Sequence, residues 1–134
     1  MQDIFLRLLI TGGIMAVLDA FWLSVVANKF YKSNLGSLLL EKPNMAAAVA
    51  FYIIYVIGIV AFVLTPALEK NSWQYAAGMG ALFGFVAYAT YDLTNLATLK
   101  GFSLKVVLVD LAWGTLLTGA VSVLAYLAIK QWIS

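Results

Sequence analysis

Three aspartates stand inside long apolar stretches of this chain: Asp19, Asp92 and Asp110. Charged side chains are costly at bilayer depth, and where they occur they usually mark a functional site or a buried polar contact. Carboxyl groups in unequal surroundings can act as acid and base, and intramembrane carboxyl groups can also bind cations or exchange protons. We therefore expect any chemistry of this chain at these three positions.

The three aspartates are predicted to lie at one depth, together with one tyrosine. Asp92 precedes Gly101 by nine residues and Asp110 follows it by nine, so each lies roughly 13 Å along its helix from that turn. Asp19 and Tyr52 stand at a similar distance from the connection between the first two apolar stretches, which opens on the same side. Four polar side chains from four helices are thus predicted to reach one level and to contact one another.

Each aspartate also has aromatic or amide neighbours within one turn of its own helix. Tyr88 and Asn95 flank Asp92 at i−4 and i+3, and Asp19 and Asp110 are each followed by tryptophan at i+3. Buried tryptophan N–H and tyrosine O–H groups donate to carboxylates. With no lysine or arginine at this depth, we expect at least one aspartate to be protonated at neutral pH, or a cation to be bound. The candidate ligand-binding residues are Asp19, Trp22, Tyr52, Tyr55, Tyr88, Asp92, Asn95, Asp110 and Trp113.

A structural interpretation competes with a ligand site. A protonated aspartate that is bonded to another helix fastens a membrane bundle by about 0.6 kcal/mol, and such fastening does not need three acids at one level. Their shared depth therefore favours a site.

Composition places the chain in the membrane. Of 134 residues, 64% are hydrophobic and 14 are charged (8 Lys+Arg and 6 Asp+Glu), whereas soluble domains are about 25% charged. The net charge of +2 is no footprint for nucleic acid. Cysteine and histidine are absent, so thiol chemistry is excluded, and we expect no cofactor and no metal site.

The apolar pattern predicts an all-α fold, an integral membrane four-helix bundle that forms a single domain over residues 1–134. Asp19 interrupts the first apolar run and no cleavage site follows it, so a retained helix is favoured over a signal peptide. The first connection combines lysines with leucines, which predicts a short interfacial helix. Pro66 is expected to end the second span, and Trp73 and Trp132 to be interfacial anchors. The predicted spans are residues 4–27, 45–65, 74–99 and 104–129.

One face of the third span carries a regular pattern. Gly80, Gly84, Tyr88 and Asp92 recur every four residues, so they share one side of the helix. The two glycines predict close packing against another helix. Loops one and three hold five lysines against three cationic residues on the other side, which predicts that these loops are cytoplasmic.

Three motifs resemble a known family. L-D-A-F-W-L at Leu18–Leu23, Y-D-L-T-N-L-A-T-L-K-G-F at Tyr91–Phe102 and V-D-L-A-W-G at Val109–Gly114 are similar to a family of small bacterial four-span proteins. That family is catalogued as predicted membrane proteins, a domain of unknown function. The resemblance implies a multi-pass protein of the bacterial inner membrane, with a role in lipid metabolism or envelope stress. It assigns no catalytic residue.

Three functions remain open on these residues. The first is binding or transport of a small cationic or amphipathic ligand or of protons, for which four spans lead us to expect a homodimer. The second is a membrane enzyme of lipid modification that uses aspartate and tyrosine chemistry. The third is an accessory subunit, which would contact its partner through the small-residue face of the third span.

Overall fold

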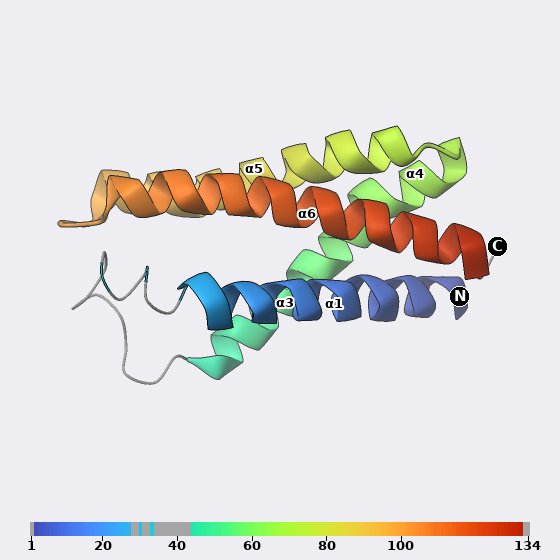
Figure 1. Cartoon of the computed structure of the whole chain (residues 1–134), viewed down its shortest axis with the longest axis horizontal. Helices are drawn as coiled ribbons and strands as arrows, with labels where there is room; N and C mark the ends of the chain where they lie inside the picture. The colour runs from blue at the N-terminus through green and yellow to red at the C-terminus, as the bar shows by residue number, and fades with distance from the viewer. Residues whose placement is uncertain (1, 28–29, 31–32, 34–43, 133–134) are drawn as a thin grey trace.

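The computed structural model describes residues 2–27, 30, 33 and 44–132, and these are almost entirely helical, with no strand among them (Figure 1). The prediction of an all-α membrane fold is confirmed. The predicted interfacial helix of loop one and the Trp132 side chain lie outside the described residues. The elements are α1 (Gln2–Trp22), the π-helical turn η1 (Leu23–Ala27), α3 (Met45–Ile59), the π-helical turn η3 (Val60–Leu64), α4 (Thr65–Lys70), α5 (Trp73–Thr98) and α6 (Leu104–Trp132).

Three helical segments of the described chain are long and apolar enough to cross a membrane. They are Ile4–Val25, Met45–Lys70 and Leu104–Gln131. The helix α5, which is the third predicted span, has 26 residues and is long enough to cross a membrane. It is not one of these three segments, and its sequence places Asp92, Thr94, Asn95 and Thr98 close together near its end.

Side-chain caps explain where the helices begin. The side chains of Asn44 and Ser72 accept hydrogen bonds from backbone N–H groups at the starts of α3 and α5. In the last turn, Gly101 adopts a φ of 73°, and Ser103 Oγ accepts from the Val106 N–H at 3.3 Å. Both residues suit this turn, since glycine tolerates positive φ and serine caps helices.

The second helical segment does not end at Pro66, and this prediction was wrong. A π-helical turn over Val60–Leu64 precedes the proline, and the Thr65 N–H bonds to the Val60 carbonyl five residues back. Pro66 then stands in the first turn of α4, where its missing N–H removes no helical hydrogen bond. The helix therefore continues to Lys70.

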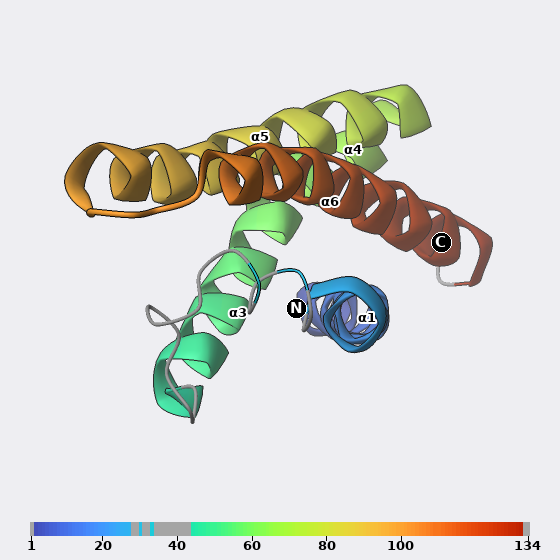
Figure 2. The ribbon, with the colours of Figure 1, turned by 60° about the vertical axis from the view of Figure 1, so that its left-hand side comes forward.

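The helices α5 and α6 form the most extensively packed pair, and they run side by side in Figures 1 and 2. A Cβ atom added at Gly84 would overlap the Gly114 carbonyl oxygen and the Thr118 side chain, and one at Gly80 would overlap Ser122. The prediction that this glycine face packs closely against another helix is confirmed, and the helix is α6 of the same chain. The face expected to recruit a partner is therefore already covered.

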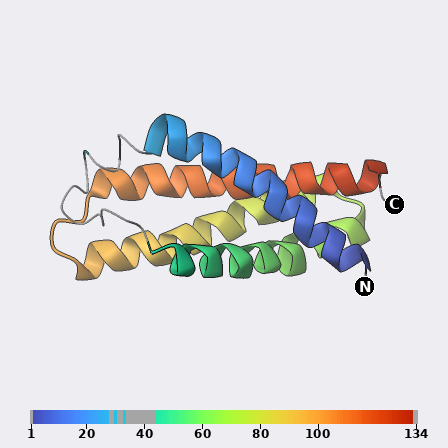
Figure 3. The same ribbon diagram turned by 90° about the horizontal axis from the view of Figure 1, so that it is seen from below.

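The first half of α3 packs very differently. Residues 45–51 are all exposed, and Figure 2 shows this part of α3 leaving the α5–α6 pair at a wide angle. The buried core begins further along, where Ile59, Val63 and Leu64 are at most 1% exposed. Both termini lie at that packed end (Figure 3). The loop-one end of the bundle is thus the open end.

Candidate functional site

Asp19 of α1 lies at the junction with α3 and α6. Its half-buried carboxyl group interacts with the Tyr52 hydroxyl and with the Trp113 indole N–H. Trp113 Nε1 is buried and has no hydrogen bond of normal length and angle, so this contact is a polar approach and not a closed hydrogen bond. The expected meeting of Asp19 and Tyr52 is seen in the structure.

The two deep tryptophans pair with each other. The rings of Trp22 and Trp113 stack with centroids 4.3 Å apart and planes 9° from parallel. Asp19 thus approaches the tryptophan of α6 rather than Trp22 on its own helix. The repeated spacing of aspartate and tryptophan at i+3 therefore leads to contacts between helices, not within one turn.

Tyr55 mainly forms contacts between helices. Its hydroxyl shares a 2.7 Å hydrogen bond with Thr118 Oγ1 of α6, and its side chain is 5% exposed. Its ring stacks on Phe51 and Phe83, with centroids 5.2 and 5.4 Å away. The geometry of Tyr55 is that of a structural contact beside the site.

Asp92 is fully buried on the face of α5 that packs against α6, and neither carboxylate oxygen has a hydrogen-bond partner. The expected bonds from Tyr88 and Asn95 are absent, and Asn95 is only half-buried. Asp92 is consequently a buried acid whose carboxyl group is not stabilised by a hydrogen bond from its own helix.

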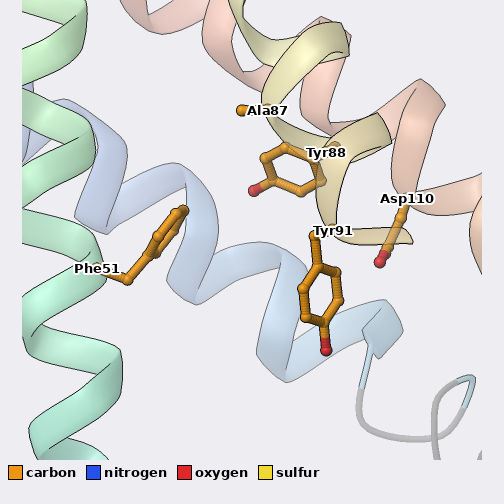
Figure 4. A pocket seen from close by; sticks show the side chains of 5 residues that line it. All are labelled: Phe51, Ala87, Tyr88, Tyr91 and Asp110. Atoms are coloured by element: carbon orange, nitrogen blue, oxygen red, sulfur yellow. The ribbon is translucent and has the colours of Figure 1, made fainter. Parts of the chain in front are cut away.

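Asp110 of α6 is 8% exposed and forms part of the wall of a cavity of about 380 Å³. The other lining residues are Phe51, Ala87, Tyr88 and Tyr91. Figure 4 shows Phe51 on α3 across from the two tyrosines of α5, with Asp110 projecting beside Tyr91. One carboxyl group thus shares a cavity with three aromatic rings.

Tyr88 connects the cavity to the buried acids. Its ring packs onto Gly114 so closely that a Cβ there would overlap it. The hydroxyl lies within electrostatic range of both Asp19 and Asp92, and the ring meets Tyr55 edge to face at 6.4 Å. Tyr88 therefore lines the cavity and also lies near Asp19 and Asp92.

The three aspartates do not converge on one point. Among the described residues, no three carboxyl groups lie close enough together to hold a metal ion. Asp19 lies at the α1–α3–α6 junction, Asp92 lies between α5 and α6, and Asp110 lies in the cavity wall. Of the four polar groups of the level, the structure brings Asp19 and Tyr52 together and leaves the Asp92 carboxyl group without a hydrogen-bond partner. Equal depth along four helices does not determine the direction in which each side chain points.

Three cavity residues were not anticipated: Phe51, Ala87 and Tyr91. Phe51 and Tyr91 precede Tyr52 and Asp92 by one residue, so they lie at nearly the same depth as the predicted level. A search for aromatic side chains at that depth, regardless of helix face, would have included them.

The fold and the site define a helical membrane protein with a set of acidic and aromatic side chains near one end. The chain belongs to the DUF2177 family, described as predicted membrane proteins, whose family model matches residues 4–127. The predicted resemblance is thereby confirmed. No curated protein and no solved structure matches the chain.

Proposed function

We propose that this protein is a multi-pass protein of the bacterial inner membrane that binds an amphipathic ammonium compound in the cavity between α3 and α5. In this proposal α5 also crosses the membrane, as the third of four spans, because its 26 residues suffice and the face that carries Asp92 is turned toward α6. The lysine-richer loops one and three are then cytoplasmic.

The main support for this proposal is the set of residues that line the cavity. Phe51, Tyr88 and Tyr91 surround a space that also receives the Asp110 carboxyl group (Figure 4). Aromatic faces attract ammonium groups within about 6 Å, and a carboxylate supplies the opposite charge. A volume of about 380 Å³ also falls in the usual range for small-molecule sites.

The surroundings of the cavity support access from the lipid phase. Phe51 and Tyr91, which line the cavity, are 49% and 62% exposed. An alkyl chain can lie along this apolar surface while its ammonium group enters the cavity. This arrangement favours a ligand with one cationic end and one apolar end.

The test uses purified protein in lipid nanodiscs and decyltrimethylammonium as the probe, followed by tryptophan fluorescence. Asp110→Asn should weaken binding about tenfold, because it removes the charge of the cavity. Phe51→Ala should weaken it roughly threefold through loss of one aromatic face. Decanol, which has no charge, should bind the wild type and Asp110→Asn equally.

Glu69→Gln provides the matched control, since Glu69 is an exposed carboxylate in α4, near the packed end of the bundle. It should leave probe binding unchanged. Equal affinity of the wild type and Asp110→Asn for decyltrimethylammonium would reject the proposed ligand class.

Binding of this kind suits a carrier, and with four spans such a carrier is expected to act as a homodimer. A lipid-modifying enzyme or an accessory subunit is the alternative function. The enzyme is less well supported because Asp92, the most deeply buried acid, is not among the residues that line the cavity. Crosslinking in native membranes tests the dimer.

A further inference from the structure

A second polar group lies toward the other end of α1 and is independent of the acidic cavity. Arg7 donates from Nη1 to Thr65 Oγ1 at 3.0 Å, which links α1 to α4. Arg7 Nε is buried and has no acceptor. One turn further along α1, Thr11 is 0% exposed and its Oγ1 also has no partner.

The edge of the guanidinium that forms no hydrogen bond is the edge that suits an oxyanion. In arginine, Nε–H and Nη2–H point in parallel, and this pair can donate two hydrogen bonds to one phosphate or carboxylate group. The bond to Thr65 uses Nη1, and therefore leaves that parallel pair available. Among the residues whose side chains the structure describes, which do not include Asp3, Arg7 forms no ion pair.

The other cations of this end have different environments. Lys130 Nζ of α6 donates to Asn71 Oδ1 in the turn between α4 and α5. Lys70 Nζ lies 5.6 Å from the centre of the Tyr75 ring. Arg7 instead bonds to Thr65, and its neighbour in sequence, Leu8, packs against the apolar core cluster that contains Val60 and Leu64. A buried donor in such surroundings is costly unless an acceptor reaches it.

The helix opposite Arg7 is irregular at this point. The π-helical turn Val60–Leu64 adds one residue to the turn before Thr65, which rotates all residues after it around the helix axis. Thr65 thereby faces α1 and bonds to Arg7. Single π-helical turns are frequent at functional sites, and this one places a hydroxyl group next to the guanidinium.

We propose that Arg7, Thr11 and Thr65 form an anion site that takes a phosphate group at the end of the bundle opposite the acidic cavity. Arg7 lies within the first two turns of α1, near the level of lipid headgroups if α1 crosses the membrane. Two sources present the same chemistry, the phosphodiester of an acidic phospholipid and free inorganic phosphate.

Native mass spectrometry of the detergent-solubilised protein tests the lipid source. Phosphatidylglycerol should be retained about tenfold more strongly than phosphatidylcholine with the same acyl chains. Arg7→Gln should abolish this preference, and Arg7→Lys should reduce it strongly, because lysine keeps the charge but loses the parallel donors. Lys70→Gln removes a charge at the same end and should leave the preference intact.

Inorganic phosphate tests the soluble source through its effect on the thermal unfolding temperature. If phosphate stabilises the wild type but not Arg7→Gln while phosphatidylglycerol does not discriminate, the site binds a free oxyanion. If Arg7→Gln fails to fold, Thr11→Val should weaken binding while Arg7 and its bond to Thr65 are kept. An equal loss in Arg7→Gln and Lys70→Gln would overturn the proposal, and so would a wild type that neither prefers phosphatidylglycerol nor is stabilised by inorganic phosphate. Binding of decyltrimethylammonium is measured separately, so the two proposals can fail independently.

Discussion

The α5–α6 pair and the first half of α3 are both apolar, yet they pack in opposite ways. Along α5, Gly80 and Gly84 bring the backbone of α6 into contact, whereas residues 45–51 of α3 are exposed throughout. Close packing between membrane helices depends on small residues that match on both surfaces. The tight pair buries Asp92, and the departure of α3 leaves the space that Asp110 and three aromatic rings line.

Breaking the tight pair should have the largest effect. In Gly84→Leu, the new side chain would overlap the Gly114 carbonyl oxygen and Thr118. Because backbone cannot move aside as a flexible side chain can, we expect a loss of more than about 3 kcal/mol in stability. Denaturation monitored by circular dichroism measures it.

Gly78→Leu is the control for that substitution, since Gly78 lies on the same helix and no atom lies within 4 Å of its added Cβ. It should change stability by less than about 0.5 kcal/mol. Comparable losses in the two variants would contradict the close packing of α5 on α6.

Replacing the buried Asp92 should have the opposite effect on the stability of the protein. Asp92 is fully buried without a hydrogen-bond partner, so Asp92→Leu should stabilise the protein by about 1–3 kcal/mol. If Asp92 only fastened helices, the same variant would destabilise the protein. Thermal unfolding of the wild type, Asp92→Leu and Asp92→Asn distinguishes these outcomes.

The junction between α1 and α6 should show a smaller effect. Trp22 and Trp113 stack at 4.3 Å, and such pairs contribute about 0.5–1.5 kcal/mol beyond their buried area. A double-mutant cycle with Trp22→Ala and Trp113→Ala should return a coupling energy in this range. Strictly additive losses would show that the stack contributes nothing of its own.

The smallest effect is expected where α3 joins the tight pair. Tyr55→Phe removes the 2.7 Å hydrogen bond to Thr118, and hydrogen bonds between membrane helices contribute about 0.6 kcal/mol on average. Probe binding in the Asp110 cavity should be unchanged, because the Tyr55 hydroxyl already bonds to Thr118. A tenfold loss of probe binding would instead show that Tyr55 contributes to the ligand site.

Much of this architecture could be predicted from periodicity and local chemistry. The face shared by Gly80, Gly84 and Asp92 follows from four-residue spacing on a helix, and the caps follow from serine, asparagine and glycine at the turns. The depth of Asp19 and Asp110 was also available from counting residues. From the sequence alone, Arg7 is only a charged residue near the end of a predicted span.

The amino-acid sequence by itself determined which segments are helices, where several of them begin, and how far along its helix each acid lies, because these properties depend on neighbours within one or two turns. Only the tertiary structure decided that Asp19 approaches Trp113, that Asp92 has no partner and that Asp110 shares a cavity with Phe51. Those outcomes depend on how α3 diverges and how each helix is rotated. Both follow from packing summed over residues far apart in the chain, which local spacing does not encode.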